Sequence, residues 1–433
     1  MAAISEPELA LEHKGGTLGR VAWAFYDWAN SSYAAIISTF VFPTYFARQV
    51  ASDPTTGTTL WGNTVGIAGL LVALAAPALG AITDQDGRRK PWIALFTLLC
   101  VLATAALWLV RPQLSSVLPA MLLAGLATVA SELAVVFYNA MLPSLTHPAR
   151  LGRWSGWAWG LGYVGGIGCL LLALLGFVQD PGWFALPRDE FEHVRATFVL
   201  VAVWYAVFSL PLFLFTPDEA ARGIRPRQAI RDGLGQLRDS IRRVRAYAAI
   251  LRFLIARMIF IDGLATIFAF GGVYAAGTFG MNEEQVLLFG IALNVTAGLG
   301  AAAFAWIDDW LGSKETILVS LVGLMIPAAL LLFIKSLTLF WLFGMLLGVF
   351  VGPAQAAGRS YLAHAAPPVL RNEMFGLFAF SGKATAFAGP LLVAWVTAAF
   401  DSQRAGMSVI LFLLAIGFAL MLRVPAAGRV PSH

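Results

Sequence analysis

Five ionisable side chains stand out within the long apolar stretches of this sequence. They are Asp27, Glu132, Arg257, Asp262 and Arg359. A charged side chain at the centre of a bilayer costs about 3 kcal/mol on insertion scales, so it needs either a partner charge or a function. The chemistry open to such groups is the binding of a proton, an ion or a charged solute.

Polar residues accompany the two earlier carboxylates at helical spacing. Asn30 lies three residues after Asp27, and Asn139 lies seven residues after Glu132, so each pair shares one face of a helix. Glu132 lies deeper in its apolar stretch than Asp27 does, which makes it the first candidate for carrying a proton, with Asp27 second. The alternative for each is a structural ion pair.

Basic residues dominate the later apolar stretches. Arg257 and Asp262 are five residues apart, about 140° around a helix, so each is expected to pair with another helix. Arg359 lies near the end of its stretch, where a long side chain can also reach water. Lys383 follows a glycine, and it either pairs with a charge or neutralises carbonyl groups where the helix bends.

A short charged loop occurs twice between apolar stretches. In both copies an aspartate precedes a glycine by three residues and a basic residue follows that glycine by two, which suggests that the chain was built by duplication. We expect these loops to act as gates rather than as binding sites. Their candidate residues are Gly80, Asp84, Gly87, Arg88 and Arg89 in the first copy, and Asp309, Gly312 and Lys314 in the second.

The composition is typical of an integral membrane protein. Of 433 residues, 59% are hydrophobic and only 12% are charged, against about 25% charged in soluble domains. Twelve apolar stretches have about the length that a helix needs to cross a bilayer. They are 21–47, 61–82, 92–110, 117–140, 154–178, 196–216, 249–276, 285–307, 315–334, 339–361, 374–399 and 406–423. We therefore predict an all-α membrane protein with twelve transmembrane helices in two pseudo-symmetric halves of six.

The loop charges set the orientation. Most Lys and Arg outside the apolar stretches fall in loops that share one side with both termini, which places the termini in the cytoplasm. The predicted parts are a tail (1–20), an N-terminal half (21–216), a linker (217–248), a C-terminal half (249–423) and a second tail (424–433). The linker contains a basic amphipathic helix suited to an anionic membrane surface, with binding of a protein partner as the alternative.

Several classes of function are excluded by what the sequence does not contain. The five histidines are scattered without metal-ligand spacing, and no GxxxxGK[ST] loop for a nucleotide is present. No cofactor or metal is expected, and no enzyme site emerges. Although the net charge is +5, the basic residues follow membrane topology rather than forming a nucleic-acid surface.

Two levels of family resemblance rest on these motifs. The first charged loop resembles the signature between helices 2 and 3 of major facilitator superfamily transporters, with Gln85 where that superfamily usually has arginine. Residues 23–31 (WAFYDWANS), 137–143 (FYNAMLP) and 375–385 (FGLFAFSGKAT) look like the vacuole-effluxer branch, which includes the fungal autophagy-related amino-acid effluxers and bacterial relatives. In the resembled fold helices 1, 4, 7 and 10 line a central cavity, and each of these helices carries a charge here.

The resemblance implies a secondary transporter, working as a monomer, that exports an amino acid or a related small polar metabolite. Alternating access and proton coupling are expected, in a bacterial inner membrane. The partners are then a small-molecule substrate, membrane lipids and protons. The alternatives are an exporter of drugs or lipids, which predicts an apolar cavity, and a non-transporting sensor or scaffold, which has little reason to keep the charges.

Overall fold

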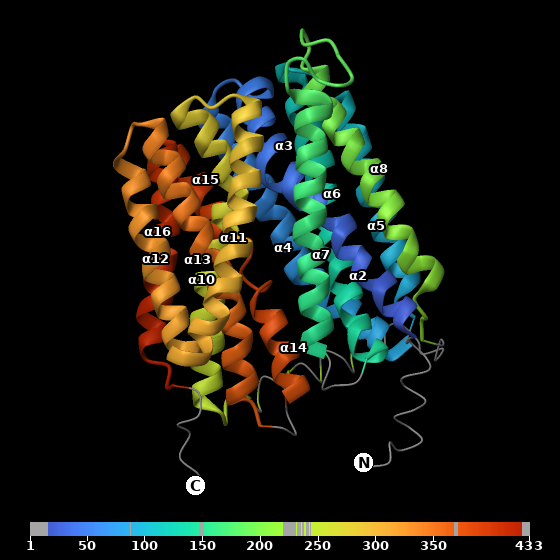
Figure 1. The fold of residues 1–433 in the computed structure, drawn as a ribbon, viewed down its shortest axis with the longest axis vertical. Helices are drawn as coiled ribbons and strands as arrows, with labels where there is room; N and C mark the ends of the chain where they lie inside the picture. The colour runs from blue at the N-terminus through green and yellow to red at the C-terminus, as the bar shows by residue number, and fades with distance from the viewer. Residues whose placement is uncertain are drawn as a thin grey trace. The chain divides into compact units, whose positions relative to one another are not determined.

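The computed structural model describes residues 16–86, 88–146, 151–219, 231, 235, 238, 239, 242, 244–367 and 371–426. These residues form helices joined by turns and loops, as Figure 1 shows. The longer helices are α2 (Thr17–Ser32), α4 (Pro54–Asp86), α5 (Lys90–Ala106), α6 (Val117–Leu145), α7 (Leu151–Ala173), α8 (Glu192–Phe215), α10 (Ala248–Phe279), α11 (Glu283–Leu311), α12 (Ser313–Phe333), α13 (Leu337–Ala365) and α16 (Gln403–Leu422). Two shorter helices, α14 (Arg371–Ser381) and α15 (Ala388–Phe400), lie between α13 and α16 in the chain.

Ten of the helices in the described part of the chain are long and apolar enough to cross a membrane. Large apolar side chains on these helices are exposed. On α6, for example, Leu118, Leu122 and Leu126 recur every four residues and are 64%, 65% and 46% exposed. A row of exposed leucines along a helix is costly in water and favourable in lipid.

Two of the predicted helices differ from single regular α-helices. The first apolar stretch is helical from Thr17 to Val50, but after α2 it changes to wider π-helical turns in η1 (Tyr33–Phe40) and η2 (Phe46–Val50), with the short α3 (Val41–Tyr45) between them. The stretch predicted at 374–399 is interrupted, because turns replace the helix between α14 and α15.

The contacts divide the chain into two compact units. The first contains Met1–Phe42 and Leu74–Leu234, and the second contains Pro43–Ala73 and Gly235–His433. In the first unit α2 packs on α7 and α8, and α5 packs on α6 and α8. In the second unit α10 packs on α16, and α13 packs on α11 and α12.

Residues 43–73 are tied to the later helices by hydrogen bonds within the second unit. Arg48 Nη1 donates to the Met281 carbonyl at 2.6 Å. Gln403 Nε2, in the first turn of α16, donates to the Pro54 carbonyl at 3.2 Å and to Thr58 Oγ1 at 2.8 Å. The beginning of α4 is thereby fixed to the beginning of α16.

Side chains just before α4 and α11 satisfy the N–H groups that a helix start leaves unpaired. Asp53 accepts hydrogen bonds from the backbone of Thr55 and Thr56, at 3.0 and 2.9 Å, and from the Thr56 hydroxyl. These bonds, chiefly that from the Thr56 hydroxyl, lower the pKa of Asp53 from its ordinary value. At α11, Asn282 and Gln285 form a reciprocal capping box.

Candidate functional site

In the first unit, α2 and α6 bring polar side chains together around Asp27. The Tyr138 hydroxyl donates to Asp27 Oδ2 at 3.1 Å, and the Ser131 hydroxyl donates to Asn30 Oδ1 at 2.9 Å. Ser131 and Tyr138 are seven residues apart on α6, so both point to the same neighbouring helix. These four residues are called the Asp27 cluster below.

Aromatic packing fixes the position of Tyr138 in this cluster. Its ring stacks on Trp23 with 4.6 Å between centroids and on Tyr26 with 4.9 Å. Trp23 Nε1 donates to the Tyr138 carbonyl at 3.0 Å, and all three side chains are buried. A buried tyrosine held on both faces has little rotamer freedom, so its hydroxyl is preorganised toward Asp27.

Glycines of α7 allow α2 to approach closely at the same level. A Cβ on Gly162 would stand 3.5 Å from Asp27 Cβ, and one on Gly165 would stand 2.7 Å from the Trp28 carbonyl oxygen. Small residues at this spacing are typical of close contacts between membrane helices. The glycine-rich part of α7 therefore packs closely against α2 at the level of Asp27.

Glu132 and Asn139 are not members of the Asp27 cluster. Each follows a cluster residue of α6 by one position, which turns it by about 100° around the helix. Glu132 is half-buried and Asn139 is exposed. The structure therefore brings Asn30 together with Asp27 and places Glu132 and Asn139 on an adjoining face of α6.

In the second unit, Arg257 of α10 contacts the end of α14. Its Nη1 donates to the Phe378 carbonyl at 2.8 Å and to the Ser381 hydroxyl at 2.9 Å, and its guanidinium carbon lies 3.5 Å from the centre of the Phe378 ring. The last carbonyls of a helix carry partial negative charge, so a cation there is favourable. Arg257 thus places a positive charge at the partly negative end of α14, where the interruption begins.

Asp262 of α10 contacts the beginning of α15. Its Oδ2 accepts a hydrogen bond from the Gly389 backbone N–H at 3.0 Å. A helix start carries partial positive charge, which favours a carboxylate. The two ionisable residues of α10 therefore contact opposite ends of one interruption, each with the complementary sign, rather than pairing with each other.

The other two predicted cations of this unit belong to elements next to Arg257. Arg359 is half-buried on α13, directly after Gly358, where a Cβ would stand 3.9 Å from Arg257 Nε. Lys383 lies in the turns after α14, directly after Gly382, where a Cβ would stand 3.2 Å from Arg257 Nη1. Three basic residues thus come from three neighbouring elements, and the glycines make room for the guanidinium group.

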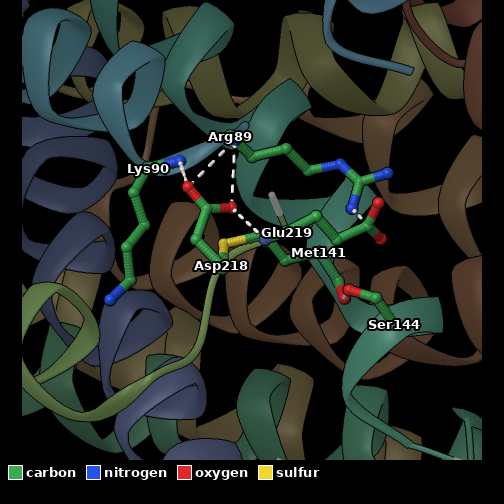
Figure 2. Close-up of polar contacts among 6 residues, drawn as sticks. All are labelled: Arg89, Lys90, Met141, Ser144, Asp218 and Glu219. Carbon is green, nitrogen blue, oxygen red and sulfur yellow. Dashed lines mark hydrogen bonds and ion pairs between the residues drawn. The ribbon is translucent and has the colours of Figure 1, made fainter. Parts of the chain in front are cut away.

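The first charged loop is held by the residues that follow α8, as Figure 2 shows. Asp218 accepts hydrogen bonds from the backbone N–H groups of Arg89, at 3.1 Å to Oδ1, and Lys90, at 3.0 Å to Oδ2. The Arg89 guanidinium forms an ion pair with Glu219 at 3.1 Å. Arg88 is exposed. The segment after α8 therefore caps α5.

Replacing Asp218 by alanine is expected to lower the free energy of unfolding by about 1 to 2 kcal/mol, the usual cost of a lost helix cap. Asn at this position should keep much of the effect, because its amide oxygen can still accept one bond. Glu219→Gln is the matched control, since a half-exposed ion pair contributes only about 0.5 kcal/mol. Thermal unfolding in detergent checks the order; equal losses for Asp218→Ala and Glu219→Gln would contradict it.

The remaining loop candidates are described only in part. Gly80, Asp84 and Asp309 lie in helices, but their side chains lie outside the described residues, as does all of Gly87. Gly312 separates α11 from α12 with a φ of 94°, which favours glycine.

Lys314 Nζ, in the first turn of α12, donates to the Leu422 carbonyl near the end of α16 at 3.3 Å. In the linker, the predicted amphipathic helix falls mostly outside the described residues.

Sequence reasoning missed several residues that complete these groups. Tyr138, Ser131, Phe378 and Ser381 are uncharged, and charge was the signal that selected candidates. A signal was nonetheless available, because Ser131 and Tyr138 share a face of α6. Proline at position 390 is a second signal, since it tolerates only the first turn of a helix and so indicates a helix start shortly before it.

Solved structures show the same fold over almost the whole chain. A point mutant of the nucleoside transporter NupG aligns with a TM-score of 0.67 at 13% identity, covering 94% of this chain and 98% of that one. A bacterial homologue of the human lysosomal transporter Spinster, inward-facing and unoccupied, also gives 0.67 at 13% identity, with 97% of both chains covered. The protein is therefore an all-helical membrane protein with the major facilitator fold.

The chain belongs to the family described as vacuole effluxer Atg22 like, whose family model matches residues 58–429. The uncharacterised MFS-type transporter YxiO of Bacillus subtilis (strain 168) is 26% identical over 407 residues, with 93% of this chain and 94% of that protein covered. Autophagy-related protein 22-1 of Penicillium rubens is 23% identical over 301 residues, 63% of this chain. The match covers 49% of that fungal protein.

Proposed function

We propose that this protein is a secondary active transporter that exports an amino acid or a closely related small polar metabolite by alternating access. In this proposal the helical stretch 17–50 is the first membrane span and α14 with α15 is the eleventh, which completes twelve spans in two halves joined by the 217–248 linker. Both termini lie in the cytoplasm of a bacterial cell, and the chain acts as a monomer.

The observation that carries the proposal is the set of ionisable groups on the apolar helices. The first unit contributes the carboxylates Asp27 and Glu132, and the second contributes the carboxylate Asp262 beside the cations Arg257, Arg359 and Lys383. An amino acid has an ammonium group that a carboxylate can hold and a carboxylate that an arginine can hold.

This charge content argues against export of lipids or hydrophobic drugs. Transport of an apolar molecule needs no ionisable group within the membrane, and each such group lowers the stability of the inserted chain.

Protons are the proposed coupling ion, because Asp27, Glu132 and Asp262 are carboxyl groups within membrane-spanning helices. The charged loops around Asp84 and Asp309 are proposed to act as latches on the cytoplasmic side. The family name supports efflux as the direction.

The proposal is tested by a thermal-shift screen of the purified protein against amino acids, dipeptides, sugar acids, neutral sugars and hydrophobic drugs. We expect amino acids to raise the Tm in a saturable way. Asp27→Asn should weaken the apparent affinity of the best amino acid at least about tenfold, because a charge-assisted contact contributes about 1.5 to 3 kcal/mol.

Asp401→Asn is the control, since Asp401 is an exposed carboxylate in the turn after α15 and asparagine tolerates its left-handed backbone. It should leave the affinity unchanged. A screen in which only hydrophobic drugs shift the Tm, or in which no amino acid does, would overturn the assignment of the substrate class.

A further inference from the structure

The interruption between α14 and α15 contains a carboxyl group that is only half satisfied. Asp262 is 3% exposed, and its Oδ2 accepts one hydrogen bond from the Gly389 N–H. Its Oδ1 has no hydrogen-bond partner within the described part of the chain. A buried carboxylate oxygen without a donor is costly, whereas a protonated carboxyl group can itself donate from that oxygen.

A second oxygen, the Thr266 hydroxyl, faces the same glycine as the unsatisfied one. The Thr266 hydroxyl, one helical turn further along α10, donates to the Asp262 carbonyl at 2.7 Å and keeps its lone pairs as acceptors. A Cβ on Gly389 would stand 3.1 Å from Asp262 Oδ1 and would collide with Thr266 Oγ1. Both oxygens therefore converge on the space that glycine leaves open at the start of α15.

Charged and titratable side chains on α10 and on its neighbours are the groups that could influence Asp262. On α10 itself they are Arg252, which is exposed, Arg257, whose Nη1 is engaged with Phe378 and Ser381, and Tyr274, whose hydroxyl donates to the Leu331 carbonyl. Next to Gly263, α16 presents the apolar Leu413 and Leu414. The charged or titratable side chains described on the other elements packed against α10 are Arg48 in η2, Glu283, Glu284 and Asp308 on α11, Arg359, Tyr361 and His364 on α13, Lys383 in the turns and Arg404 on α16, while α15 has none.

Asp262 has no ion pair with any of these groups among the described residues. Its ionised form is held by the start of α15 alone, and its neutral form has a hydroxyl acceptor nearby. The ionised and the protonated forms of Asp262 thus each have a hydrogen-bonding group available, the Gly389 N–H and the Thr266 hydroxyl. A group that gains and loses a proton reversibly needs both forms to be stabilised in this way.

We propose that Asp262 is the carboxyl group that binds the coupled proton during transport. When ionised, it holds the start of α15 through the Gly389 N–H. When a proton from water adds to the carboxylate, the attraction to the helix start weakens, the new hydroxyl donates toward Thr266, and α15 is released to move. The inference rests on the proposed coupling to protons, and it moves the proton from Glu132 and Asp27 to Asp262.

The test compares two modes of transport by the full-length protein in liposomes, using an amino acid that the wild type carries. A gradient of one pH unit supplies about tenfold accumulation if one proton moves with each solute. Asp262→Asn should lose this stimulation, falling below about twofold, while counterflow of labelled against unlabelled amino acid, which needs no net proton movement, stays within about threefold of wild type. Asp401→Asn should retain both modes.

A second variant decides the question if Asp262→Asn does not fold. Thr266→Val keeps the shape of the side chain but removes the acceptor for the protonated form, so the pH at half-maximal transport should move about one unit lower. An unchanged pH midpoint would count against the inference.

The outcomes separate the inference from the proposed function. If wild-type transport ignores a pH gradient, the coupling proposal itself fails. If the wild type responds and Asp262→Asn responds equally, proton coupling stands and the assignment to Asp262 is wrong. If a sodium gradient drives the wild type in place of protons, the coupling proposal and the proton assignment to Asp262 both fail.

Discussion

Replacing Arg257 by glutamine is expected to reduce amino-acid counterflow by roughly 30-fold. Arg257 donates two hydrogen bonds to the end of α14 and stacks on Phe378. Charge-assisted hydrogen bonds contribute about 2 kcal/mol, and a loss of that size lowers the equilibrium constant for ordering this segment by a factor of about 30, which sets the size of the expected effect. Counterflow rate and Tm, measured on the same preparation, check the prediction.

The matched control lies on the same helix. Arg252 is exposed and five residues earlier on α10, so Arg252→Gln should leave both measurements unchanged. Arg257→Lys should be intermediate, because lysine restores the charge but cannot reproduce the planar stack on Phe378. If lysine restored full activity, charge alone would explain Arg257; if Arg252→Gln were equally damaging, the effect would not belong to the interruption.

A second large effect is expected where α7 meets α2. Gly165→Ala would place a Cβ 2.7 Å from the Trp28 carbonyl oxygen and 2.9 Å from its Cα, both backbone atoms that cannot turn away. Overpacking of this kind costs about 2 to 3 kcal/mol, and we expect the Tm in detergent to fall by roughly 5 °C. Because α2 carries Asp27, amino-acid affinity should fall with it.

Gly160→Ala is the control on the same helix, since no atom lies within 4 Å of the Cβ it would add. Alanine favours a helix over glycine by about 1 kcal/mol, so the Tm should stay level or rise slightly. Equal losses for the two variants would mean that α7 tolerates no substitution for reasons unrelated to its contact with α2.

Ten of the twelve predicted spans match helices in the described part of the chain that are long and apolar enough to cross a membrane. Their signal is long-range apolarity, which the bilayer imposes on every spanning helix. The ends of most described helices lie within a few residues of the predicted spans. The interruption at 382–387 was anticipated only as a bend, in one of the two alternatives for Lys383, and local preference explains why a full break was not predicted. Alanine, the strongest helix former, occupies 384, 386 and 388, so the segment favours a continuous helix. Hydrogen bonds from α10 hold the interruption.

Several candidate residues could be found from sequence, whereas their hydrogen-bond partners could not. Charge within an apolar stretch singled out Asp27, Arg257 and Asp262, each of which the structure joins to a neighbouring helix. Their partners could not be read from sequence, because two of the three bonds end on backbone groups, the Phe378 carbonyl and the Gly389 N–H. A backbone group is present in every residue and carries no compositional signal.

The cap on α5 was missed for a related reason. Asp218 is separated from Arg89 by 129 positions, and it was assigned to the linker on composition. Asp218 lies three residues after the end of α8, and α8 packs on α5. Only the return of α8 along α5 brings this carboxylate to the helix start, so the contact depends on the packing of the first unit rather than on local pattern.

The most direct test of the account is amino-acid counterflow in liposomes that contain the purified protein. Liposomes loaded with an unlabelled amino acid are diluted into a trace of the same labelled amino acid without any ion gradient. We expect transient accumulation of label above its equilibrium level, strongly reduced by Arg257→Gln. If no amino acid enters faster than into protein-free liposomes, the central claim that this family member carries amino acids is contradicted.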